Sequence, residues 1–361
     1  MRHRAIAVLA LSGLALASHA TAAAAPSPWF LSQAAGLQQT ADRNAALDYW
    51  RLVNTTSYAD DLPARAGEAF KLLHPDPEGE DQAIEAPATL LPGGELAAEL
   101  AEIADFMDDL ERASRETHCD FQVRYEDGYA ALLPHLGHMR NFARLLVTDA
   151  RRLALAGDTT GAADRLATSL RMARHITGDR ILISSLVSAA ITDMTIKEAY
   201  WLFQRTQDAP EIRQILGKAA DRFPADDPHK VELALRTERD LVASLARQFR
   251  GPTAGREFAS LFLPMTGDSE EQSVESELQR LDGGQFKSEV EKAVDAFDLV
   301  FEAWNAADPP AELRMLGEHF ASGDFGPVAV VVVPAFGRAY KSDARARETL
   351  EAFRARVNDD G

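Results

Sequence analysis

The chain has 361 residues, of which 46% are hydrophobic and 26% are charged, a composition typical of folded globular proteins. Its 56 acidic and 38 basic residues give a formal charge of −18, which disfavours binding to nucleic acid backbones and to anionic membrane surfaces. The one cysteine, Cys119, excludes an internal disulfide and a metal site built from several thiolates. We expect Cys119 to be buried, since free cysteine is among the most buried residue types. A bond to another chain is the alternative.

Residues 1–22 have the pattern of a secretory signal peptide. A basic start with Arg2 and Arg4 is followed by an apolar run over 5–17 and by the small residues 20–22, which fit a cleavage site. The apolar run is shorter than the roughly 20 residues that a membrane-spanning helix needs. The pattern predicts cleavage after residue 22 and a periplasmic or secreted mature protein without stable membrane insertion. An uncleaved N-terminal anchor is the alternative.

Prolines and glycines mark the predicted loops of the N-terminal third. Residues 23–41 are expected to form a linker, and 42–52 a first short amphipathic helix. Residues 74–95 hold four prolines and three glycines, which helices do not tolerate, so this stretch is predicted to be a loop. Apolar residues then recur three and four apart over 96–114, which predicts one helix.

The middle of the chain predicts a helical hairpin. One stripe of apolar residues, three and four apart, comprises Leu136, Met139, Ala143, Leu146, Ala150 and Leu153. Gly157 then suits the left-handed position that ends a helix, and Asp158 suits the cap of the next one. The pair Gly178–Asp179 is expected to end the second helix in the same way. Helices joined by so short a connection lie antiparallel, as in a single tetratricopeptide-like unit.

A third helix is predicted over 181–204, and it is apolar almost all round. A helix without a polar face is buried, so we expect it to be the central element of the fold. Asp193 lies within it. This residue is a binding candidate if its carboxylate is buried with partners, or an ordinary polar residue if it lies on an exposed rim.

The predicted fold class is all-α: a helical bundle, or array of helical hairpins, around the buried central helix. No alternation of strands and helices is seen, which excludes a doubly wound sheet. The main domain is expected over 42–250, followed by a flexible acidic connection over 251–284 and a C-terminal helical segment over 285–361 that packs on it. Further helices are predicted over 210–220, 227–250, 286–304, 310–320 and 342–357. The valine-rich stretch 324–334 fits a strand or a helix, and the absence of a partner strand favours the helix.

Common catalytic motifs are absent: there is no G-x-S-x-G, H-E-x-x-H or phosphate-binding glycine loop. The best metal-ligand candidates are His118, Asp120, His135 and His138. On a helix His135 and His138 share a face, which suits zinc. The alternative is that they are ordinary polar residues at the start of a helix. No cofactor is predicted.

Arginines form a basic edge on the helix that follows residue 134. Arg140 and Arg144 are binding candidates there, for a groove that takes an acidic peptide or glycan. Arg151 and Arg152 extend the same edge. Salt bridges to the many local acids are the alternative interpretation.

The chain also resembles a group of uncharacterised exported proteins of planctomycete-type bacteria. The likeness spans roughly 44–200 and is carried by "NAALDYW", "CDF", "YEDGYAALLPHLGHMRNFARLLVTDARRLALAGDTTGAADRLATSLRMARHI" and "LISSLVSAAI". The resemblance implies an all-helical fold with a tetratricopeptide-like hairpin. It implies no catalytic residue, because the group carries no assigned activity.

Together these patterns favour a non-enzymatic binding or scaffold protein of the bacterial cell envelope, with a protein or peptide as partner and no nucleic acid. Helical hairpins form concave surfaces that bind such partners. One alternative is an exported hydrolase, acting with or without a metal ion, with a site near His118, His135 and His138. Another is a structural component that self-associates through the apolar stretch 328–336.

Overall fold

A computed structural model describes residues 43–55, 60–74, 86–207, 209–262, 269–306, 309–321, 326–332 and 336–358. The predicted signal peptide, the linker 23–41 and half of the predicted loop 74–95 lie outside these residues. Within them the fold is all-α, as predicted, and the only β-type pairing is an isolated bridge between Asn44 and His118. No helix in this part of the chain is both long and apolar enough to cross a bilayer.

Four helices form the N-terminal layer: α3 (Ala45–Thr55), α4 (Leu62–Leu73), α5 (Glu95–Glu102) and α6 (Ala104–Ser114). The single helix predicted over 96–114 is in fact two helices. Ile103 separates them with a backbone of φ −99° and ψ 22°, outside the helical range. The apolar spacing hid this break because Ile103 and Met107 remain buried on the same side.

The predicted central hairpin is present as α7 (Pro134–Leu155) and α8 (Thr159–Ile176). Gly157 has φ +94°, the left-handed conformation expected of it. Asp158 caps α8, since its Oδ1 accepts a hydrogen bond from the Gly161 amide at 2.9 Å. Both local predictions are therefore confirmed, while the tetratricopeptide-like character of the hairpin stays a prediction.

The connection that follows α8 differs from the prediction. A short 3-10 helix, Thr177–Asp179, follows α8, and the left-handed residue is Arg180 (φ 54°) rather than Gly178. Asp179 does not cap the next helix, because its carboxylate is buried and accepts a hydrogen bond from His135 Nε2 at 2.7 Å. The Asp179 side chain, which the local sequence predicted to cap the next helix, is thus engaged in a tertiary contact instead.

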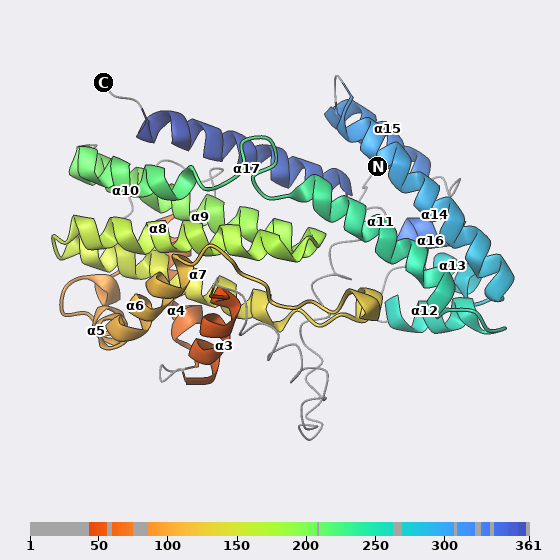
Figure 1. Ribbon diagram of the computed structural model, residues 1–361, viewed down its shortest axis with the longest axis horizontal. Helices are drawn as coiled ribbons and strands as arrows, with labels where there is room; N and C mark the ends of the chain where they lie inside the picture. Colours follow the sequence, from red (N-terminus) through yellow and green to blue (C-terminus); the bar gives the residue numbers. More distant parts are fainter. Residues whose placement is uncertain are drawn as a thin grey trace.

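Helix α9 (Leu182–Thr206) lies in the middle of the molecule. Figure 1 shows α7, α8 and α9 as a central layer, with α3–α6 on one side and α10 and α17 on the other. Ile191 is buried and Leu186 is partly buried against neighbouring helices, as expected of a central helix. Asp193 lies on the partly exposed rim, where it pairs with Lys197 at 2.9 Å, which matches the second of the two interpretations.

The remaining helices are α10 (Pro210–Ala220), α11 (Val231–Gln248), α12 (Ala254–Phe262), α13 (Ser269–Leu278), α14 (Gly283–Trp304), α15 (Pro309–Ala321), α16 (Gly326–Val332) and α17 (Phe336–Val357). The stretch 324–334 contains a helix, α16, as predicted, and not a strand. Helices α12 and α13 occupy much of the stretch that we expected to be flexible. Helix α11 starts later than predicted, at Val231, whose amide donates to Asp227 Oδ1 at 2.9 Å.

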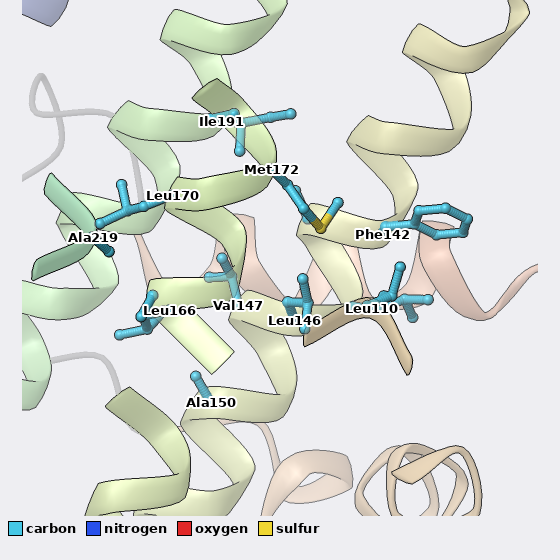
Figure 2. Packing of buried hydrophobic residues seen from close by; sticks show 14 of the residues in the cluster. Leu110, Phe142, Leu146, Val147, Ala150, Leu166, Leu170, Met172, Ile191 and Ala219 are labelled. Carbon is cyan, nitrogen blue, oxygen red and sulfur yellow. The ribbon is translucent and has the colours of Figure 1, made fainter. Parts of the chain in front are cut away.

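Buried apolar side chains form two cores. The first joins α3–α10, and Figure 2 shows side chains from several of these helices packed together. Leu350 and Phe353 of α17 belong to it as well, so the C-terminal helix packs on the first core. The second core joins α11 to α16, with Leu235 of α11 and Val328 of α16 both fully buried. Residues on both sides of position 250 contribute to each core, and the expected domain boundaries stay a prediction.

The first core predicts a large cost for a cavity in α8. Leu170 of α8 is fully buried, and Figure 2 shows it among the packed side chains of this core. We expect Leu170→Ala to lower the free energy of unfolding by about 2–5 kcal/mol, because a cavity remains where the side chain was. Urea denaturation measures the change. Leu132→Ala is the control: this leucine is 77% exposed, and its loss should cost about 0.5 kcal/mol or less.

Candidate functional site

A cavity of about 390 Å³ lies where the start of α11 approaches the turn between α8 and α9. Its walls are residues 117–120, Tyr125, the C-terminal end of α8, the turn after it and Lys230. The volume is in the range of small-molecule binding sites, about 300–1,000 Å³. We call this cavity the α8–α11 pocket.

The segment 117–120 is held in place by the start of α3. The Asn44 side chain donates to the Asp120 carbonyl at 3.0 Å and accepts from the Asp120 amide at 2.9 Å. The Ala45 amide donates to the His118 carbonyl at 3.0 Å. On the opposite wall a Cβ at Gly178 would lie 3.0 Å from the Cys119 carbonyl oxygen, so glycine allows the two walls to approach closely. The pocket is therefore built on a fixed frame.

Three cationic side chains line the pocket: Arg174, Arg180 and Lys230. In the described part of the chain, none of the three pairs with a carboxylate. Arg174 makes one long hydrogen bond, to the Thr117 carbonyl at 3.5 Å, and its buried Nε has no partner there. Arg165, by contrast, contacts two carboxylates within 3.1 Å. Unpaired cations are thus gathered in one place, although acids outnumber bases in the chain as a whole.

The cations also repel one another. Burial lowers the pKa of Lys230, and the neighbouring charges of Arg180 and Arg174 lower it further. Burial and the charge of Arg222 likewise lower the pKa of Arg174. Mutual repulsion of this kind favours any anion that enters the pocket, since the anion would offset it.

Three further groups that line the pocket, His175, Tyr125 and Cys119, have pKa values that keep them uncharged at neutral pH. Burial lowers the pKa of His175 to about 4 and raises the pKa of Tyr125 to about 12. Burial also raises the pKa of Cys119 well above its usual value, so its half-buried thiol is neutral. The pocket therefore has a positive fixed charge.

Two of the three cations have a strained backbone. Arg180 and Lys230 have φ values of 54° and 53°, in the left-handed region that side chains with a Cβ rarely adopt. Only two other non-glycine residues in the described ranges share this conformation, Gln122 and Gln207. Such strain costs roughly 1–3 kcal/mol per residue and is concentrated at functional sites.

The predicted metal ligands are not brought together. His118 and Asp120 line the pocket, but His135 is buried, stacks on Phe121 at 4.2 Å between ring centroids and donates to the Asp179 carboxylate. His138 does share a face with His135, yet both lie against the Trp50 ring, within 6.4 Å of its centroid. Across the described ranges no three His, Cys, Asp or Glu side chains form a group suited to a metal ion. The aromatic packing explains why His135 and His138 do not join His118 and Asp120 in one group.

The other binding candidates also lie outside the pocket. Arg140 is exposed, and Arg144 is half-buried and donates to Asn141 Oδ1 at 3.3 Å. Neither these arginines nor Asp193 contributes to the α8–α11 pocket.

The other half of the basic edge forms salt bridges. Arg152 pairs with Asp149 at 2.6 Å. Arg151 is buried, and its Nε and Nη2 donate to the two oxygens of Glu198 at 2.5 and 2.8 Å. His74 contacts the same carboxylate at 2.8 Å, so the cluster ties the end of α4 to α7 and α9. The salt-bridge interpretation of the basic edge therefore holds for Arg151 and Arg152, although the sequence did not predict that His74 joins the buried cluster.

Two buried histidines predict how stability depends on pH. The Tyr49 hydroxyl lies 3.0 Å from Nδ1 of His175 and the Glu116 carbonyl 2.9 Å from Nε2, which suits a neutral ring that accepts from one and donates to the other. Burial lowers the pKa of His229 to about 3. In the unfolded chain a histidine takes up its proton near pH 6.5. The unfolded state therefore binds more protons between pH 6.5 and 4, and stability falls as the pH drops through this window.

We expect His229→Phe to reduce this pH dependence. Each histidine contributes up to about 1.4 kcal/mol of unfolding free energy per pH unit within its window. Asp343 acts in the opposite direction below pH 6, because burial raises its pKa to about 6. Urea denaturation of wild type and variant at several pH values isolates the histidine contribution. An unchanged slope between pH 6 and 4 would show that His229 is not held neutral.

Sequence spacing gives no signal for Arg174, Arg180 and Lys230 as a group. The first two flank the turn after α8, and the third lies 50 positions beyond the second. Comparisons of the chain with protein-family models, curated proteins and solved structures found no match. The features that bear on function are the volume, charge and backbone conformation of the α8–α11 pocket.

Proposed function

We propose that this chain is an exported, all-helical binding protein of the bacterial cell envelope whose ligand presents an anionic group to the α8–α11 pocket. One observation supports the anionic ligand most strongly. Three cations without a carboxylate partner in the described residues converge on a single cavity, in a chain where acids are in excess. Partly buried charges are costly when unpaired, and a bound anion would supply the missing partner.

The pocket chemistry favours binding over catalysis. Cys119 is the one thiol of the chain, and burial raises its pKa, so the nucleophilic thiolate is disfavoured. His175 has hydrogen-bond partners at both ring nitrogens, Tyr49 and the Glu116 carbonyl, and is not positioned as a base for that thiol. The proposal therefore assigns the pocket to recognition.

The cellular part of the proposal rests on the sequence. The signal-peptide pattern of residues 1–22 supports export, and the resemblance to exported helical proteins supports the same location. A protein or peptide partner stays a prediction from the sequence, separate from the ligand of the pocket.

Calorimetric titration of the purified protein tests the anionic ligand. The probes are benzoate, phenyl sulfate and phenyl phosphate, which share an aromatic group and differ in the anion. We expect at least one to bind, and Lys230→Gln to weaken that binding about tenfold or more, because a charge-assisted hydrogen bond contributes about 1.5–3 kcal/mol.

Lys197→Gln is the matched control. Lys197 pairs with Asp193 on the rim of α9 and does not line the pocket, so its loss removes the same charge without affecting binding. Binding of none of the probes at millimolar concentration, or equal weakening by both variants, would contradict the proposal.

A further inference from the structure

We infer that the anionic group of the ligand is a phosphate monoester of a small molecule, bound as its dianion by Arg174, Arg180 and Lys230. This inference rests on the proposed function and names the chemical class of its ligand. It follows from the number of cations, from the segments that carry them and from the size of the cavity.

The number of charges favours a dianion over a carboxylate. Three cations face the pocket, and among its lining residues only Asp120 opposes them with a carboxylate. A carboxylate would offset one charge and leave the others repelling each other. A phosphate monoester dianion carries two charges and has three terminal oxygens, one for each cation.

The cations come from three different places along the chain. Arg174 belongs to the last turn of α8, Arg180 to the connection between α8 and α9, and Lys230 directly precedes α11. Such an arrangement suits a tetrahedral group with oxygens in several directions, whereas the two oxygens of a carboxylate lie in one plane. A planar group is better matched by a single bidentate arginine.

The left-handed residues strengthen this assignment. Arg180 and Lys230 adopt the same rare backbone conformation from unrelated segments, and both line the same cavity. Glycine or asparagine would adopt this conformation at lower cost. Arginine and lysine nevertheless occupy these two positions, against the local backbone preference. A binding role explains why a long basic side chain occupies each position.

The cavity is larger than a phosphate group alone. Its volume of about 390 Å³ is more than ten times the roughly 30 Å³ that one water molecule takes in the liquid. An organic remainder therefore fits beside the phosphate. Thr117, His118 and Asp120 also line the pocket and add polar groups to it, which suits a ligand with hydroxyl groups of its own.

Titration at several pH values separates a phosphate monoester from other anions. The second pKa of a phosphate monoester is about 6, so the dianion rises from about a tenth of the total at pH 5 to nearly all of it at pH 7.5. Phenyl sulfate stays a monoanion throughout. We expect the affinity for phenyl phosphate, relative to phenyl sulfate, to increase about tenfold from pH 5 to pH 7.5 at constant ionic strength.

The ratio of the two affinities removes every effect of pH that is common to both probes. Loss of protons from the protein as the pH rises makes the pocket less positive and acts against the dianion more than against the monoanion, so an increase in the ratio comes from the phosphate itself. A ratio that does not change with pH would overturn the phosphate assignment and leave the proposed anion site standing. Absence of binding by both probes and by benzoate would overturn the proposed function as well.

Discussion

Replacing Arg180 and Lys230 together with glycine is expected to weaken the binding of phenyl phosphate at least a hundredfold and to leave the protein equally stable or more stable. Two charge-assisted contacts are lost, each of which contributes about 1.5–3 kcal/mol. Both residues have positive φ values, which glycine adopts without strain. Calorimetric titration measures the affinity, and urea denaturation measures the free energy of unfolding.

Gln207→Gly is the matched control for this double variant. Gln207 ends α9 with φ 51°, so glycine relieves the same kind of backbone strain there, but the residue does not line the pocket. We expect its affinity for phenyl phosphate to equal that of wild type. A double variant that binds as tightly as this control would show that the two cations do not form the site.

The Glu198→Ala variant is expected to lose about 3–5 kcal/mol of unfolding free energy. Glu198 is buried and accepts hydrogen bonds from Nε and Nη2 of Arg151, while His74 contacts the same carboxylate. Its removal leaves a buried, uncompensated cation between α7 and α9. Chemical denaturation checks the loss, and Glu198→Gln, which keeps the shape of the side chain, should give a smaller one.

Glu232→Ala provides the contrast with an exposed ion pair. Glu232 pairs with Arg236 one turn later on α11, at 2.7 Å and in contact with solvent. Its loss should cost no more than about 1 kcal/mol. Equal losses from Glu198→Ala and Glu232→Ala would mean that the buried cluster does not hold α4, α7 and α9 together.

Local sequence predicted the parts of the fold that depend on local interactions. The apolar spacing of α7 and α8 and the turn at Gly157 and Asp158 involve neighbours within a few residues, and the structure confirms them. The same reasoning was wrong at Gly178 and Asp179. There a long-range hydrogen bond from His135 takes the Asp179 carboxylate, and Arg180 makes the left-handed turn instead of the glycine.

The site was predicted only in part. His118 and Asp120 do line a cavity, but their expected partners His135 and His138 pack against aromatic rings. No sequence pattern indicates that Arg174, Arg180 and Lys230 form a group, because their proximity depends on how α8, α9 and α11 pack. Arginine and lysine also rarely adopt the left-handed backbone conformation, so residue preferences do not predict it at Arg180 or Lys230.

A crystal structure of the protein grown with tungstate, a tetrahedral dianion visible by its anomalous scattering, tests the central claim most directly. We expect one strong anomalous peak inside the α8–α11 pocket, within hydrogen-bond distance of Arg174, Arg180 and Lys230. A pocket without tungstate at saturating concentration, with the same three side chains paired to carboxylates of the chain itself, would contradict it.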